Sequence, residues 1–74
     1  MTITIYKSKT NPDLGFSIQE CKGEITLWVD ECEGGEAYQD DWTYDDEQPD
    51  FKNVQEAQDY IYQTYGEVEL LDTY

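Results

Sequence analysis

The chain contains no arginine and no histidine, and only four of its 74 residues are lysines. Without histidine there is no imidazole to act as a general base near neutral pH or to ligate zinc. Without arginine there is no planar group that holds a phosphate through two parallel hydrogen bonds. The lysines are too scattered to form a basic groove, so a nucleic-acid-binding protein of the usual kind is not expected. They are Lys7, Lys9, Lys22 and Lys52.

Long apolar runs are missing as well. No stretch approaches the roughly 20 apolar residues that a membrane-spanning helix needs. The first residues, MTITIY, lack the basic segment followed by an apolar segment that marks a secretory signal. We therefore expect a cytoplasmic protein. The hydrophobic residues, 38% of the chain, recur in regular patterns, which indicates a folded domain rather than a disordered chain.

Carboxylates are the most abundant charged groups. Eighteen Asp and Glu residues give a formal net charge of −14, and ten of them lie within the 21 residues from Asp30 to Asp50, where there is no positive charge. Such a field attracts cationic surfaces and repels nucleic acid, phosphate ligands and anionic membranes. The sequence therefore predicts a partner protein with a basic surface, and no direct binding to nucleic acid or membrane.

The N-terminal residues alternate in polarity. From Thr2 to Lys7, Ile3 and Ile5 share one side of the chain, which is the period-two pattern of a strand. The segment TNPD at residues 10–13 then predicts a turn, because Asn and Asp cap turns and Pro fixes φ. A first strand followed by a reversal of the chain is therefore expected.

Residues 15–21 and 24–31 predict a hairpin around Lys22 and Gly23. A loop of two residues places Ile18 opposite Leu27, whereas a loop of three scatters the apolar residues over both faces. The two-residue loop is therefore expected, although lysine is not ideal where φ is positive. The apolar face of the hairpin then contains Phe16, Ile18, Ile25, Leu27 and Val29.

The stretch that follows is harder to interpret. Gly34 and Gly35 end the hairpin strand, and the alternation around Trp42 and Tyr44 favours a further short strand. Both rings are then expected to pack beside Val29 and Leu27. Pro49 ends this segment.

A helix and a last strand complete the predicted domain. Asn53 and Glu56 have the spacing of a capping box, and Gly66 follows the last apolar residue of the helical pattern. The residues at helical spacing are Val54, Ala57, Ile61 and Tyr65. Residues 67–71 alternate and predict a final strand. We expect a single α+β domain over residues 1–74, with an antiparallel sheet of four to five strands and one helix on one face, in the order β-β-β-(β)-α-β.

The two cysteines, Cys21 and Cys32, are expected to be free thiols. The hairpin register places them about 26 Å apart along the ladder, whereas a disulfide needs Cα atoms within about 7 Å. Neither belongs to a Cys-x-x-Cys pair, and the anionic surroundings do not favour a reactive thiolate. We interpret both as small filler residues.

Catalysis and specific metal binding are not expected. Paired carboxylates can act as acid and base, but they need a substrate cleft, and a domain of this size has little volume left for one once its core is filled. The pattern of an EF-hand calcium loop is not matched between Glu31 and Asp50. We therefore predict no enzyme and no cofactor, and keep a small divalent-metal-binding protein as an alternative.

The acidic stretch is the candidate partner-binding surface. On one face of a strand, carboxylates recur about every 6.6 Å, a spacing comparable to that of successive phosphates along a nucleic-acid strand. A surface that holds phosphates with Lys and Arg would accept such a row in their place, and aromatic rings among the acids are typical anchors. A purely solubilising role for the acids is the alternative. The candidate residues are Asp30, Glu31, Glu33, Glu36, Tyr38, Asp40, Asp41, Trp42, Tyr44, Asp45, Asp46 and Glu47.

In size, acidity and α/β composition, the chain resembles small phage-encoded inhibitors that imitate DNA: anti-CRISPR proteins, anti-restriction proteins and uracil-DNA glycosylase inhibitors. The TNPD turn at 10–13, followed by Gly15 and Phe16, is similar to the N-terminus of one small anti-CRISPR family. Residues 51–57 after the strands are similar to the arm-binding domain of phage integrases, but acids replace the basic DNA-contacting strands of that domain, so DNA binding is not implied.

The resemblance implies an inhibitor that occupies the DNA or RNA site of a basic partner in the cytoplasm of the host cell. A nuclease or a CRISPR effector subunit is the expected partner. The alternative is an acidic adaptor or antitoxin-like protein that neutralises a basic host protein at a site unrelated to nucleic acid.

Overall fold

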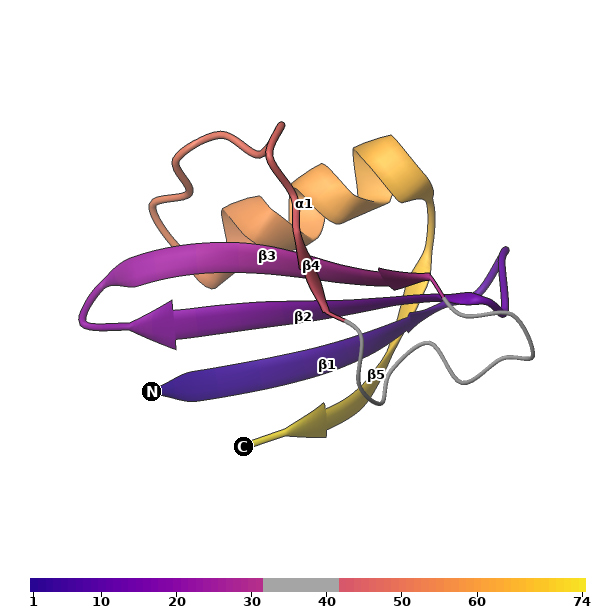
Figure 1. Cartoon of the computed structure of the whole chain (residues 1–74), viewed down its shortest axis with the longest axis horizontal. Helices are drawn as coiled ribbons and strands as arrows, with labels where there is room; N and C mark the ends of the chain where they lie inside the picture. Colours follow the sequence, from indigo (N-terminus) through magenta and orange to yellow (C-terminus); the bar gives the residue numbers. More distant parts are fainter. Residues whose placement is uncertain (32–41) are drawn as a thin grey trace.

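The computed structural model describes residues 1–31 and 42–74, which form one antiparallel sheet and one helix. In the sheet the strands lie in the order β4-β3-β2-β1-β5, with α1 over one face (Figure 1). The predicted α+β class, with its five strands and single helix, is confirmed. The elements are β1 (Thr2–Ser8), β2 (Leu14–Cys21), β3 (Glu24–Glu31), β4 (Thr43–Tyr44), α1 (Val54–Tyr65) and β5 (Val68–Thr73).

The hairpin of β2 and β3 has the predicted register. Lys22 and Gly23 form its two-residue turn, with φ of 53° and 81°. Positive φ at both positions is what a type I′ turn requires, and this turn matches the right-handed twist of the two strands. Cys21 pairs with Glu24, and every following pair is set by that turn.

The predicted turn between β1 and β2 is also present. The backbone N–H of Asp13 donates to Oδ1 of Asn11 over 3.0 Å, so the asparagine side chain holds the reversal of the chain. β1 then runs antiparallel to β2, with Tyr6 opposite Phe16. Because directly paired residues lie on the same face, Tyr6 faces α1, and Ile5 lies on the other face of the sheet.

The core lies between α1 and the face of the sheet that the hairpin pattern predicted. Ala57 and Ile61 of α1 are fully buried against it. The ring of Tyr65, at the end of α1, packs on Phe16 with the ring centroids 4.9 Å apart. Burial of apolar surface at about 25 cal/mol per Å² offsets the mutual repulsion of the carboxylates. The buried residues of the cluster are Tyr6, Leu14, Phe16, Ile18, Ile25, Leu27, Phe51, Ala57 and Ile61.

Both ends of α1 are capped as the sequence predicted. Oδ1 of Asn53 accepts a hydrogen bond from the backbone N–H of Glu56 over 2.9 Å, and the carboxylate of Glu56 accepts one from the N–H of Lys52. At the other end, Gly66 has a φ of 102°, and its N–H donates to the carbonyl of Tyr62 over 3.0 Å. The helix therefore begins and ends at residues whose type suits its position.

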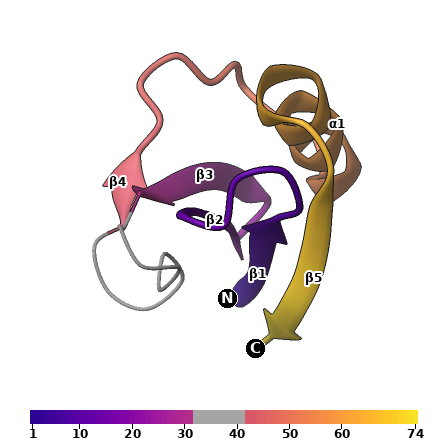
Figure 2. The same ribbon diagram turned by 90° about the vertical axis from the view of Figure 1, so that its right-hand side faces the viewer.

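The last strand returns to the sheet beside β1. β5 pairs antiparallel with β1, and a bulge shifts the register between Ile5 and Tyr6. β4 and β5 therefore lie at opposite edges of the sheet (Figure 2). Within the described ranges, no helix is long and apolar enough to cross a membrane.

The hairpin turn allows a test of this register. Lys22→Asn should raise the free energy of unfolding by about 0.5–1 kcal/mol, because asparagine tolerates positive φ better than lysine does. Lys52→Asn is the matched control, because it removes the same charge from an exposed position outside the turn. Urea unfolding of both variants measures the difference. A Lys22→Asn variant no more stable than Lys52→Asn would contradict the turn assignment.

Candidate partner-binding site

Residues 43–51 run along the outer edge of β3. Tyr44 pairs with Trp28, and further along Phe51 forms an isolated bridge with Ile25. Between these two contacts, the N–H of Asp45 donates to the carbonyl of Leu27 over 3.3 Å, and residues 45–48 then form a turn. Three consecutive acids therefore stand on a protrusion from an edge that is paired on either side.

The short strand at Tyr44 exists, but its packing differs from the prediction. Tyr44 lies opposite Trp28 rather than beside Leu27, and the two rings meet edge to face with centroids 5.4 Å apart. β4 contains only Thr43 and Tyr44. The pattern around Trp42 indicated a strand but could not set its register, because a two-residue strand has too few alternating positions to specify one.

The acids after β4 lie in a turn and not along an extended strand. The N–H of Gln48 donates to the carbonyl of Asp45 over 3.2 Å, and the N–H of Glu47 donates to Oδ1 of Asp45 over 3.0 Å. These bonds are typical of a turn closed by an aspartate side chain. The predicted phosphate-like row with its regular spacing is therefore wrong for Asp45, Asp46 and Glu47, which gather within one turn.

Gln48 fixes this turn to the sheet. Its Oε1 accepts from the N–H of Leu27 over 2.8 Å, and its Nε2 donates to the carbonyl of Leu27 over 2.9 Å and to that of Asp45 over 2.7 Å. The side-chain amide thus satisfies the backbone of β3 as a neighbouring strand residue would. Sequence reasoning missed this role, because a single glutamine beside a proline has no distinctive pattern.

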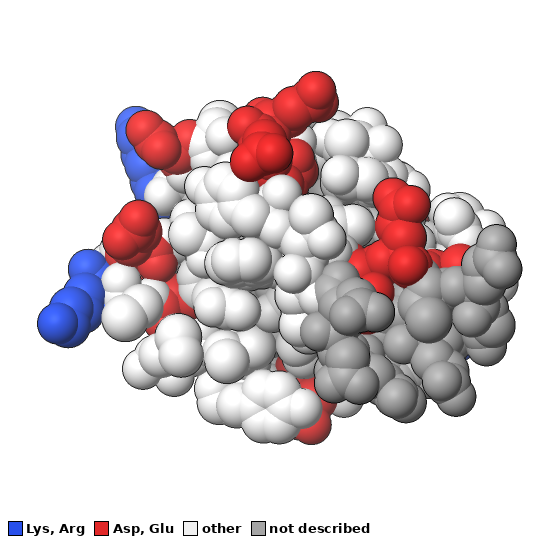
Figure 3. Space-filling view, in the orientation of Figure 1, with Lys and Arg blue, Asp and Glu red and all other residues white. Residues whose placement is uncertain are grey.

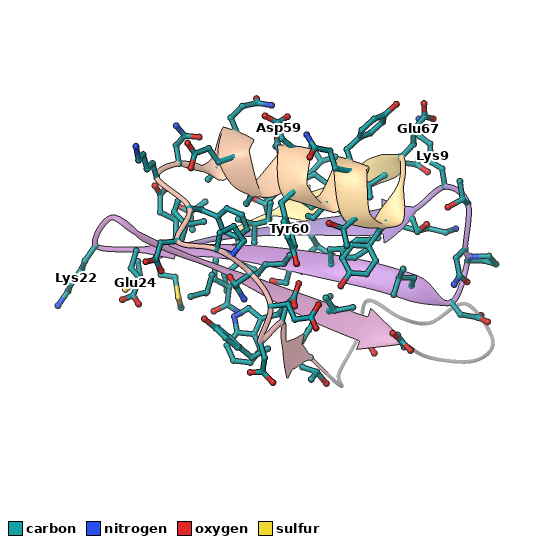
Figure 4. The ribbon with its side chains drawn as sticks, turned by 90° about the horizontal axis from the view of Figure 1, so that it is seen from above. Lys9, Lys22, Glu24, Asp59, Tyr60 and Glu67 are labelled. Carbon is teal, nitrogen blue, oxygen red and sulfur yellow. The ribbon has the colours of Figure 1, made fainter. Side chains whose placement is uncertain are left out.

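Asp45 is held from the other side by α1. The hydroxyl of Tyr60 donates to Oδ2 of Asp45 over 3.0 Å. Figure 4 shows Tyr60 and Asp59 leaving α1 on opposite sides. Burial, followed by the hydrogen bond to Asp45 and its charge, raises the pKa of Tyr60 to about 12. Burial and then the charge of Asp45 also raise the pKa of Tyr65. Asp45 therefore positions the turn, and its neighbours are the acids more available to a partner.

The turn, β4 and the end of β3 border a cavity of about 570 Å³, here called the acidic groove. Four carboxylate residues and two tyrosines line it, and no lysine is among the described residues that do so. Carboxylates pair with ammonium or guanidinium groups, and such cations also stack on aromatic faces. The groove therefore suits the side chains of Lys or Arg. Its lining residues are Val29, Glu31, Thr43, Tyr44, Asp45, Asp46, Glu47 and Tyr65.

Five of the predicted partner-binding residues line the acidic groove, and two others that the structure describes, Trp42 and Asp30, do not. Trp42 is half-buried and does not line the groove. Asp30 is only 1% exposed, so its prediction as a surface contact is wrong. Neighbouring residues of a strand point to opposite faces, so Glu31 joins the groove and Asp30 does not. Five further candidates lie outside the described residues: Glu33, Glu36, Tyr38, Asp40 and Asp41.

Tyr65 is a lining residue that sequence reasoning assigned only to the helix core. Its ring packs on Phe16, and it also borders the groove. The residue type itself was a sequence signal, because a tyrosine packed against a core usually keeps its hydroxyl within reach of a polar partner. A tyrosine at the end of the apolar face of a helix is therefore a candidate both for core packing and for lining a site at the surface.

Charge is unevenly distributed over the surface. In Figure 3, lysines lie only at one end of the visible face, carboxylates lie at both ends and along the top, and uncharged side chains fill the middle. Among the described residues, no three His, Cys, Asp or Glu side chains are grouped so that they could hold a metal ion. Cys21 is exposed and is a free thiol, as predicted, and Cys32 lies outside the described residues.

No protein-family model matches the chain, and neither a curated protein nor a solved structure matches it significantly. The resemblance to phage-encoded DNA mimics therefore stays a prediction.

The bond between Tyr60 and Asp45 predicts a pH dependence. A folded-state pKa near 12, above the ordinary value of 10.0, means that the contribution of Tyr60 to stability is complete below pH 10 and is lost as the pH rises to 12. Tyr60→Phe should lower the free energy of unfolding at pH 7 by about 1 kcal/mol and should flatten this alkaline loss. Urea unfolding between pH 7 and pH 12 checks both effects. Tyr62→Phe, at an exposed position, is the control and should change neither.

The three hydrogen bonds of the Gln48 side chain, here called the Gln48 clamp, hold the turn against β3. Their removal should loosen the structure locally. Gln48→Met keeps the size of the side chain but removes its three hydrogen bonds, and should lower the free energy of unfolding by about 2 kcal/mol. Gln63→Met, on the exposed side of α1, is the control. Amide hydrogen exchange should become faster at Leu27 and Glu47 in the first variant only. Unchanged exchange at both amides would contradict the clamp.

Proposed function

We propose that this protein is an acidic binding protein that inhibits a basic, nucleic-acid-binding partner by occupying the DNA or RNA site of that partner. The observation that supports this proposal is the acidic groove, where four carboxylate residues and two tyrosines line the described surface without a lysine. A protein surface that holds phosphates presents Lys and Arg. The acidic groove offers those side chains carboxylates in place of phosphates.

Three exposed acids are the expected contacts. Glu31, Asp46 and Glu47 are exposed and line the groove, so they can meet cations without breaking an internal bond of Asp45. Tyr65 supplies an aromatic ring at the same place, whereas Tyr44, 42% exposed, borders the groove with its ring packed on Trp28 at the opposite face of the sheet. Charge-assisted hydrogen bonds and ring stacking are the interactions by which Arg and Lys bind strongly.

The turn that carries the acids is positioned before any partner arrives. Gln48 binds it to β3, and Tyr60 binds Asp45 from α1. Side chains and loops that are already ordered lose less entropy on binding, so more of the interaction energy becomes affinity. A phage inhibitor of a host nuclease or of a CRISPR effector subunit fits this description, in line with the class that the sequence resembles.

One observation favours the second candidate function, an acidic adaptor or antitoxin-like protein. Asp45, Asp46 and Glu47 form a compact turn and not a row with the spacing of phosphates. A compact acidic patch complements any basic surface, including one that never binds nucleic acid. The two candidates share the groove and differ in whether nucleic acid competes for the partner.

The proposal predicts competition with DNA. The immobilised protein should capture from a host-cell lysate a basic protein, identified by mass spectrometry, that binds nucleic acid. Complex formation with that purified protein should weaken at least tenfold between about 50 and 300 mM salt, and labelled duplex DNA should displace the acidic protein. The triple variant Glu31→Gln, Asp46→Asn, Glu47→Gln should bind at least about tenfold more weakly, since it loses three groove charges.

A matched triple variant separates the groove from overall charge. Glu20→Gln, Glu24→Gln and Asp50→Asn remove the same number of charges outside the acidic groove, and Glu24 lies at the far end of the hairpin (Figure 4). This control should retain most of the affinity. Binding that is indifferent to DNA would overturn the proposed inhibition and leave the adaptor function. Equal losses in the two triple variants would overturn the groove as the contact.

A further inference from the structure

The two edges of the sheet differ in whether other described residues engage their backbone groups. At one edge, residues 43–51 run beside β3 and engage its backbone at Trp28, Leu27 and Ile25. At the other edge β5 is the last strand, and no described residue pairs with its outer side. β5 has no lysine or proline, and its two charged residues, Glu69 and Asp72, repel an acidic strand but not a basic one. The edge of β5 is therefore open to strand addition.

The hydrogen bonds to β1 show which backbone groups of β5 point outward. Ile3 and Tyr74 exchange both of their backbone hydrogen bonds, over 3.2 and 2.8 Å, and the N–H of Lys9 donates to the carbonyl of Glu67 over 2.9 Å. Bonded and non-bonded pairs alternate along an antiparallel ladder. In the register with β1, Val68 and Leu70 therefore direct their N–H and C=O groups to the outer edge.

A cavity of about 500 Å³ lies between α1 and β5, here called the α1–β5 groove. Two of its large side chains are exposed, Leu70 by 58% and Tyr62 by 60%. At its base, Nε2 of Gln58 donates to the hydroxyl of Tyr6, which ties α1 to β1. The lining residues are Tyr6, Lys9, Gln58, Asp59, Tyr62, Glu67, Val68 and Leu70.

We propose that the outer edge of β5 and the α1–β5 groove bind an extended segment of a partner protein, in which apolar and basic side chains alternate. The segment adds a strand to the sheet through the outward backbone groups of Val68 and Leu70. Its apolar side chains enter the groove beside Leu70 and Tyr62. This site is separate from the acidic groove, since the two share no lining residue, and it does not rest on the function proposed above.

The negative charge of the chain favours a basic partner segment at this edge over a second copy of the chain. Each chain has a formal net charge of −14, so two edges of β5 repel one another, whereas a basic segment is attracted. The basic side chains of the segment lie on the face of β5 opposite the groove, which is the face of Glu69, because Leu70 shares the α1 face with its partner Tyr6 and successive strand residues point to opposite faces. Alternation follows from the strand itself, because successive residues point to opposite faces.

Peptide binding to the isotopically labelled full chain tests the site. The probe is a capped peptide of about eight residues in which lysine and valine alternate, and its control has the same composition with all lysines before all valines. The alternating peptide should slow amide exchange at Val68 and Leu70 at least about tenfold, and the block peptide should not. Equal effects of the two peptides would overturn strand addition, since charge alone would then explain binding.

Two leucine variants locate the contact. Leu70→Lys places a positive charge in the groove and should weaken binding of the alternating peptide at least about tenfold. Leu71→Lys makes the same change at the next residue, which is 41% exposed and does not line the groove, so its effect should be smaller. Equal losses in the two variants would overturn the proposed site.

Two further outcomes would also overturn the proposal. Chemical shift changes confined to Glu31, Asp46 and Glu47 would show that the peptide binds only the acidic groove, which would leave the proposed function intact. Protection of Val68 and Leu70 that rises with protein concentration in the absence of peptide, together with a dimer in sedimentation, would show that a second copy occupies the edge. The alternating peptide should still protect Val68 and Leu70 in the triple variant of Glu31, Asp46 and Glu47. That result would support the proposal whether or not the acidic groove binds a partner.

Discussion

The register of the β2–β3 hairpin is the constraint on which the rest of the structure depends. The turn at Lys22 and Gly23 places Phe16, Ile18 and Leu27 on the face that α1 covers. A slip by one residue would turn these side chains away from α1 and remove the core. The same register aligns the backbone of Leu27 with Gln48 and sets Glu31 beside the acidic turn. Core and candidate site are thus fixed by one turn.

Tyrosines connect the core to the acids. Tyr60 packs edge to face on Phe51, with centroids 5.5 Å apart, and donates its hydroxyl to Asp45. Tyr65 packs on Phe16 and borders the acidic groove. In a chain with few cations, a phenol is a neutral donor that can hold a carboxylate without an ion pair. Aromatic burial therefore stabilises the fold and orders the acidic turn at the same time.

The two edges of the sheet offer different chemistry. The edge at β3 is paired on both sides of a turn that presents carboxylates, so it suits point contacts with Lys and Arg. The edge at β5 offers backbone groups and exposed apolar side chains, so it suits an extended segment. Because both lie on a chain of charge −14, each favours a basic protein.

The sequence by itself determined the hairpin register, the turn at Asn11 and the capped ends of α1, because each depends on contacts between residues close in the chain. The periodicity of the apolar residues indicated the α+β class. It also indicated which acids gather after β4. Only the tertiary structure decided that Asp30 is buried, that the acids at 45–47 form a turn, and that Gln48 and Tyr60 position it. The bonds of Gln48 to Leu27 and of Tyr60 to Asp45 span 21 and 15 residues of sequence, which no local pattern encodes.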